Sequence, residues 1–180
     1  MNNKHRAEKL FWSIALPGFG QLLNGKYVKG LVLIALEIII NTRSNLNEVI
    51  IFSFHGQIQE AIGQTNYHWL MFYPCIYMFG IWDAYRDAGN ENNPYSFLPF
   101  VFAAYIGTIG VIYSPTLSIY GVKFGPVWLP ILFLFLGVGI GYLLKRMCMR
   151  IALGMGGNKT NKLVFIRTYS RGKCHFHWKR

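Results

Sequence analysis

A single carboxylate stands inside an otherwise apolar stretch of the chain. Residues 31–40 read LVLIALEIII, and Glu37 is the one ionisable residue among them. A carboxylate in apolar surroundings is costly to keep charged, and such residues commonly bind or move an ion or a proton. A structural interpretation stays open beside this one. Glu37 lies within two helical turns of Asn41, so it can reach lipid headgroups or pair with a basic residue.

Three charged residues follow at helical spacing near the end of a later apolar run. Asp83 precedes Arg86 by three residues and Asp87 by four, so all three share one face of a helix. This cluster is a candidate for binding an ion or a partner, or for holding helices together. The alternative is a helix end whose charges lie among lipid headgroups. Nothing in the sequence brings Glu37 next to Asp83.

Other patterns that usually carry chemistry are weak in this chain. A glycine-rich segment lies early, but no strand precedes it and its spacing is not that of a dinucleotide site. Near the end, Cys174, His175 and His177 offer zinc or copper ligands, yet all three fall within four residues and have no partner cluster elsewhere. We therefore expect no metal or cofactor, and the missing catalytic arrangement disfavours an enzyme. The members of the glycine-rich turn are Pro17, Gly18, Gly20, Gly25 and Gly30.

The composition indicates which elements must position these residues. Apolar and aromatic residues make up 53% of the 180-residue chain, and charged residues make up only 14%. Soluble domains carry roughly 25% charged residues, so this chain has too few to cover a water-facing surface. The sequence therefore predicts an all-α integral membrane bundle.

Four apolar runs are candidates for membrane-spanning helices. The last two are free of charges and would each extend about 27 Å, near the ~30 Å of a hydrocarbon core. The last run also holds Gly137 and Gly141, whose spacing is typical of closely packed helices. A fifth run, 10–23, is interrupted by Pro17 and Gly18, so we expect a broken or re-entrant segment there. The four candidate spans are residues 27–41, 69–82, 97–114 and 127–144.

Between the first two spans, the apolar residues from Leu46 to Ile62 recur at helical spacing. This pattern predicts one amphipathic helix lying at the outer membrane interface.

The distribution of positive charge predicts the topology. Residues 145–180 hold ten Lys or Arg and no Asp or Glu. With four crossings and both termini in the cytoplasm, sixteen of the eighteen basic residues lie inside, which fits the positive-inside rule. Five crossings with the N-terminus outside fit less well, and no cleavage site supports a signal peptide. We therefore predict a membrane domain, 1–144, and a basic cytoplasmic tail, 145–180, in a bacterial-type plasma membrane.

The predicted partners follow from this topology. Cationic residues beside a span attract anionic lipid headgroups by ~1 kcal/mol each, so we expect the tail to bind such headgroups. A membrane protein partner or a second copy of the chain is also possible. Specific nucleic-acid binding is not expected, since no recognition motif accompanies the charge.

Two segments resemble a known family. Residues 16–30 read LPGFGQLLNGKYVKG, and residues 80–86 read GIWDAYR. Together they resemble small multi-pass bacterial membrane proteins related to the TM-two domain, over residues 10–87. The resemblance implies a membrane-embedded module and no particular molecular activity.

Two functional hypotheses remain. The first is a non-enzymatic structural or interaction subunit, in which Glu37 and the Asp83–Arg86 pair hold helices together or bind a partner. The second is a small transporter, or a protein that handles ions or protons, using Glu37.

Overall fold

The computed structural model describes residues 3–88 and 95–155, and these are mostly helical. The predicted all-α class is confirmed, and the described strands are two short segments forming an antiparallel hairpin. The helices are α1 (Asn3–Ala15), α2 (Phe19–Leu23), α3 (Tyr27–Ser44), α4 (Leu46–Phe54), α5 (Ile58–Gln64), α6 (Tyr67–Leu70), α7 (Tyr73–Asp87), α8 (Leu98–Tyr113) and α9 (Gly125–Met155), and the strands are β1 (Ser118–Ile119) and β2 (Val122–Lys123).

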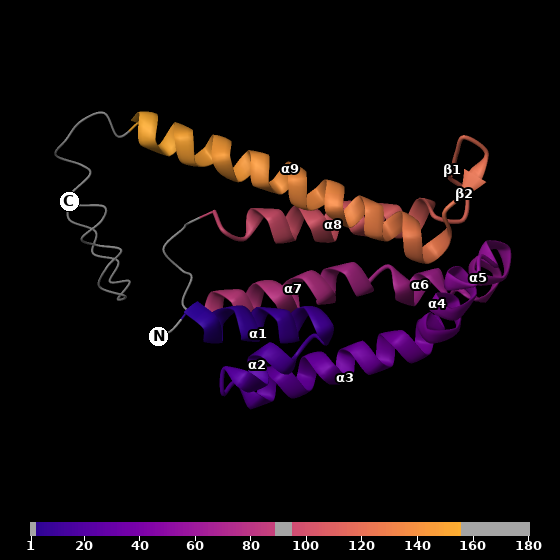
Figure 1. The fold of residues 1–180 in the computed structure, drawn as a ribbon, viewed down its shortest axis with the longest axis horizontal. Helices are drawn as coiled ribbons and strands as arrows, with labels where there is room; N and C mark the ends of the chain where they lie inside the picture. Colours follow the sequence, from indigo (N-terminus) through magenta and orange to yellow (C-terminus); the bar gives the residue numbers. More distant parts are fainter. Residues whose placement is uncertain (1–2, 89–94, 156–180) are drawn as a thin grey trace, which may run out of the picture. The chain divides into compact units, whose positions relative to one another are not determined.

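Internal contacts divide the chain into two units, Met1–Lys145 and Arg146–Arg180. Within the first unit, α3 and α8 run in one direction, and α7 and the first part of α9 run in the opposite direction (Figure 1). Helix α7 contacts α1, α2, α3 and α8, so it lies at the centre of this unit. The start of α3 and the end of α7 therefore meet at one end, while α4, α5, α6 and the hairpin lie at the other (Figure 1).

The run 10–23 is broken, as predicted. Helix α1 ends at Ala15, and α2 begins at Phe19 after a turn in which Gly18 has φ 103°. A side chain strains this left-handed backbone, so glycine suits the position. Helices α1 and α2 pack on each other and both contact α7.

The prediction of one amphipathic helix from Leu46 to Ile62 is wrong. Two helices occupy this stretch, and α4 ends where Gly56 takes up a left-handed conformation with φ 76°. The apolar spacing continues across the break, which is why the sequence pattern concealed it. Val49 and Ala61 pack together with Val127 of α9, so the two short helices cover the start of that helix.

The run 69–82 is also not a single helix. Helix α6 ends at Leu70, and α7 begins at Tyr73 with Pro74 in its first turn. Proline has no backbone N–H to donate to the preceding turn, so it favours a helix start at this position.

Glycines bring α8 and α9 into close contact, as the predicted spacing indicates. A Cβ atom on Gly137 would lie 2.6 Å from the Cα atom of Ala103, and one on Gly141 would lie 2.5 Å from the Cα atom of Pro99. Side chains at these positions would force the helices apart. Gly139, which lies between them in the sequence, faces open space.

Helix length and composition support one membrane span among the described residues, not four. Residues Gly125–Ala152 are long and apolar enough to cross a bilayer. Helix α8 is apolar but has 16 residues, and α7 has 15. Helix α3 has 18 residues but includes Lys29, Glu37 and Arg43. The prediction was based on the lengths of uninterrupted apolar runs. The helices do not have the same bounds as these runs, and α3 includes charged residues.

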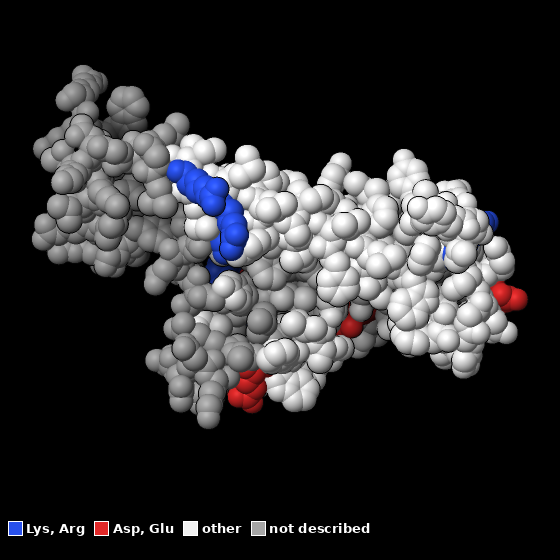
Figure 2. All heavy atoms as spheres, turned by 45° about the horizontal axis from the view of Figure 1, so that its top comes forward, with Lys and Arg blue, Asp and Glu red and all other residues white. Residues whose placement is uncertain are grey.

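The described surface is rich in large apolar side chains. Ile38 of α3, Val101 of α8 and Phe135 of α9 are among many that are exposed, whereas Gln21 and Asp83 are buried. Figure 2 shows a face made mostly of uncharged side chains, with Lys, Arg, Asp and Glu mainly toward its edges.

Candidate functional site

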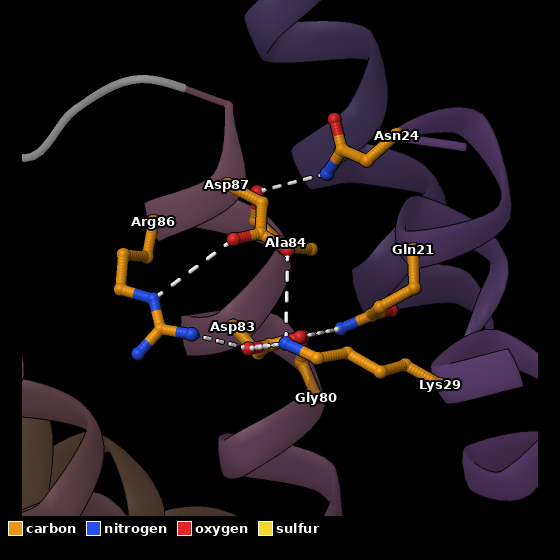
Figure 3. Close-up of polar contacts among 8 residues, drawn as sticks. All are labelled: Gln21, Asn24, Lys29, Gly80, Asp83, Ala84, Arg86 and Asp87. Carbon is orange, nitrogen blue, oxygen red and sulfur yellow. Dashed lines mark hydrogen bonds and ion pairs between the residues drawn. The ribbon is translucent and has the colours of Figure 1, made fainter. Parts of the chain in front are cut away.

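The carboxylate of Asp83 is the centre of a polar cluster at the end of α7. Its side chain is 1% exposed. Oδ1 accepts hydrogen bonds from Lys29 Nζ at 3.0 Å and from Arg86 Nη2 at 2.9 Å, and Oδ2 accepts one from Gln21 Nε2 at 3.3 Å (Figure 3). The predicted pairing of Asp83 with Arg86 is confirmed. The alternative that places these charges among headgroups is wrong for Asp83, because its side chain is buried.

Asp87 completes the charged part of this cluster. Its carboxylate lies 3.9 Å from Lys29 Nζ and 4.0 Å from Arg86 Nε. Two cations therefore face two carboxylates, and the four charges sum to zero. The guanidinium of Arg86 also lies over the ring of Trp82, 4.5 Å from its centroid, which adds a cation–π contact.

Two amides from the glycine-rich segment bind the backbone of α7. Gln21 is fully buried, and its Nε2 also donates to the carbonyl oxygen of Gly80 at 2.8 Å. Asn24 Nδ2 donates to the carbonyl oxygen of Ala84 at 3.3 Å (Figure 3). The polar residues of α2 and of the turn after it thus attach this segment to successive turns of α7.

The predicted glycine-rich turn makes this attachment sterically possible. A Cβ atom on Gly20 would lie 1.8 Å from Ser13 Oγ and 2.9 Å from Ala84 Cβ. Pro17 packs over Gly80, Gly30 of α3 faces a leucine of α2, and Gly25 turns the chain between these two helices in open space. Any larger residue at position 20 would push α2 away from both α1 and α7.

Glu37 lies apart from this cluster. It is eight residues after Lys29 on α3, about 12 Å along the helix. Its Oε2 atom is buried and has no hydrogen-bond partner among the described residues. The structure therefore does not bring Glu37 and Asp83 together.

A cleft of about 450 Å³ opens between α3 and α7. Lys29 and Asp83 are among its lining residues, but its wall is almost entirely apolar, the part beside these two residues included. The other lining residues are Val32, Leu33, Leu36, Cys75, Ile76 and Phe79.

Sequence reasoning missed the partners of Asp83. Lys29, Gln21 and Asn24 were not predicted as site residues, although all three lie beside the predicted glycines. The signal was their position in the glycine-rich segment 16–30, which the sequence analysis considered together with residues 80–86. The structure joins these two segments through the hydrogen bonds of Asp83, Gly80 and Ala84.

The other predicted ligands and most of the tail lie outside the described residues. These include Cys174, His175, His177 and residues 156–180 of the predicted basic tail, whereas residues 145–155 belong to α9. Within residues 3–88 and 95–155, no group of three or more His, Cys, Asp or Glu side chains is placed to hold a metal ion.

Comparisons with protein-family models, with curated proteins and with solved structures found no match to this chain.

Proposed function

We propose that this chain is a multi-pass integral membrane protein with a non-enzymatic structural or interaction role. In this proposal α3, α7, α8 and α9 cross the membrane, and α1 and α2 form a re-entrant segment. The observation that carries it is the large number of apolar side chains that face outward along α3, α8 and α9. In a soluble domain so much exposed apolar surface is unfavourable, because it contacts water.

Helix α9 supports this interpretation most strongly. Only 22% of its most apolar 18-residue window is buried, whereas the core helix of a soluble protein is mostly buried. The shorter helices are compatible with crossings. Helix α7 is about 22 Å long, and the short helix α6 precedes it and adds to its length across the membrane. Local bilayer thinning accommodates α8, which is about 24 Å long.

The described basic residues favour a cytoplasmic location for both termini. Two lysines, Lys26 and Lys29, lie at the start of α3, and Arg86 lies at the end of α7. These two helix ends meet at one end of the first unit (Figure 1). At the other end lie Arg43 and Lys123. The positive-inside rule assigns the end with more Lys and Arg to the cytoplasm. A bacterial-type plasma membrane and a tail bound to anionic headgroups complete this proposal.

The structural role is supported by how the polar residues are used. The charges around Asp83 are paired with one another and connect α3 to α7, and Gln21 adds α2. Such pairing stabilises a particular arrangement of helices. The resemblance to proteins related to the TM-two domain agrees with this role, because it implies a membrane module without an assigned activity.

Single engineered cysteines test the topology. In a variant lacking the native cysteines, Lys26→Cys and Phe165→Cys should react with a membrane-impermeant thiol reagent only from the cytoplasmic side. His55→Cys and Tyr120→Cys should react only from outside. Phe135→Cys is the matched control, because this position is 72% exposed on α9 and yet should be protected in the bilayer.

Two results would contradict the proposal. Rapid labelling of Phe135→Cys in intact membranes would mean that water, not lipid, covers α9. Labelling of Phe165→Cys from outside would reject the topology with both termini in the cytoplasm.

A second candidate function is the handling of ions or protons by Glu37. The observation that favours it is the buried Oε2 atom without a hydrogen-bond partner among the described residues. A half-buried carboxylate with such an oxygen can exchange a proton or bind a cation. In vesicles, Glu37→Gln should abolish flux and leave thermal stability unchanged, while the exposed control Glu48→Gln should retain flux. If the unmodified chain shows no flux and the helices of the Glu37→Gln variant come apart, the structural role is favoured.

A further inference from the structure

The wall of the cleft between α3 and α7 is almost entirely apolar, and the Lys29 side chain lies at one end of it. Lys29 and Leu36 both line it, and they lie seven residues apart on α3, about 10.5 Å along the helix. Asp83 accompanies Lys29, whereas Val32, Leu33, Ile76 and Phe79 form an apolar wall. A hydrocarbon chain matches this lining, and any charged group joined to it would lie outside the cleft, beside the exposed side chain of Lys29.

The accessible charge beside the cleft is positive. The side chains of Lys29 and Arg86 are 49% and 37% exposed, while those of Asp83 and Asp87 are 1% and 17% exposed. The carboxylates thus lie inward and the cations lie outward, although the four charges cancel. Lys26 adds another exposed cation at this end of α3. An anionic group approaching from the surface therefore meets the cations first.

We propose that this cleft binds one acyl chain of a phospholipid, with the lipid phosphate against Lys29 and Arg86. The proposal rests on the membrane location proposed above, since a bilayer supplies the lipid. Charge complementarity favours a phospholipid over a second copy of the chain, because the cations that are accessible beside the cleft match a phosphate.

Lipid retained by the purified full-length chain tests this assignment. The chain is purified in mild detergent, dioleoyl phosphatidylglycerol is added in steps, and bound lipid is counted by native mass spectrometry. The variant Leu36→Trp fills the apolar part of the cleft, and Leu31→Trp is its control. Leu31 lies on the same helix, is exposed and does not line the cleft.

We expect the unmodified chain and Leu31→Trp to retain one lipid with equal affinity, and Leu36→Trp to bind about tenfold more weakly. Leu36→Phe, a smaller change, should give an intermediate loss. Lys29→Gln should also weaken binding about tenfold, because a charged hydrogen bond to the phosphate is lost. Inorganic phosphate in excess should not displace the lipid, since it lacks the acyl chain.

Cys75 provides a second readout, because it lines the cleft and is exposed. With Cys148 and Cys174 replaced by serine, added phosphatidylglycerol should slow maleimide labelling of Cys75 in the otherwise unmodified chain. The same lipid should have no effect on this labelling in Leu36→Trp.

Three results would overturn the lipid assignment. One is equal lipid retention by Leu36→Trp and Leu31→Trp. Another is displacement of the lipid by phosphate alone. The third is a change of oligomeric state in Leu36→Trp with lipid binding unchanged, which would assign the cleft to a second copy. None of these results contradicts the proposed membrane topology, which the labelling of the engineered cysteines tests by itself. The failure of the lipid assignment can therefore be distinguished from the failure of the proposed function.

Discussion

Neutralising Asp83 should loosen the attachment of α7 to α2 and α3. The variant Asp83→Asn keeps the size of the side chain but removes the charge that two cations share. If its amide oxygen faces Lys29 and Arg86, its NH₂ group faces the Nε2 donor of Gln21. Rotating the Gln21 amide does not help, because its oxygen would then face the carbonyl oxygen of Gly80 in place of the present 2.8 Å hydrogen bond. In either orientation Gln21 makes one hydrogen bond to α7 in place of the present two, and its Oε1 atom already lacks a partner among the described residues.

The expected cost follows from the exposure of the two cations. Removing one partner of a fully buried ion pair costs about 3–5 kcal/mol, and a hydrogen bond to a charged group contributes about 1.5–3 kcal/mol. Lys29 and Arg86 are partly exposed and regain water when Asp83 is neutralised, so the lower range applies. We expect the free energy of unfolding to fall by about 2–3 kcal/mol, which corresponds to a midpoint lowered by about 4–12 °C for a chain of this size.

Thermal unfolding of the detergent-solubilised chain measures this effect. Glu60→Gln is the control, because Glu60 is an exposed carboxylate on α5 and its neutralisation should change stability by no more than about 0.5 kcal/mol. In a double-mutant cycle, Asp83→Asn and Arg86→Gln should cost less together than the sum of their separate costs. If Asp83→Asn and Glu60→Gln shift the midpoint equally, the cluster does not hold these helices together.

Two further predictions concern close packing at glycines. Gly20→Ala should lower the free energy of unfolding by about 1–3 kcal/mol through overpacking, because its Cβ would lie 1.8 Å from Ser13 Oγ. Ser13→Ala in the same chain should restore part of the loss, and a midpoint unchanged by Gly20→Ala would refute this contact. Gly141→Ala should separate α8 from α9, since its Cβ would lie 2.5 Å from Pro99 Cα. Gly139→Ala faces open space and should be neutral or slightly stabilising, so equal midpoints for these two variants would contradict the packing.

Long uniform apolar runs predicted helices well. The run 97–114 closely matches α8, and the run 127–144 lies within α9. Neither run contains a strong break. The run 69–82 and the segment from Leu46 to Ile62 were predicted less well. Apolar periodicity continues through a break and does not report the left-handed conformation of Gly56. Local backbone geometry, not hydrophobicity, decided where those helices end.

Only the contacts between residues close in sequence could be predicted for the candidate site. The pairing of Asp83 with Arg86 follows from three residues of separation along a helix. Lys29 lies 54 residues and Gln21 lies 62 residues from Asp83. Their contact depends on the path of the chain through α2 and α3, which no local pattern specifies. Composition drew attention to Glu37, and the fold places it about 12 Å along α3 from Lys29, apart from the Asp83 cluster.

In the proposed membrane setting, apolar contact alone does not select one helix arrangement, because lipid chains are as apolar as the helix surfaces. Two other interactions must then fix the register, and the fold uses them at different interfaces. Between α8 and α9, close packing at Gly137 and Gly141 sets how near the helices lie. Among α2, α3 and α7, the directional hydrogen bonds of Asp83 and Gln21 set which turns face each other. The cluster is therefore best explained as the element that keeps α3 beside α7, and the cleft between them depends on it.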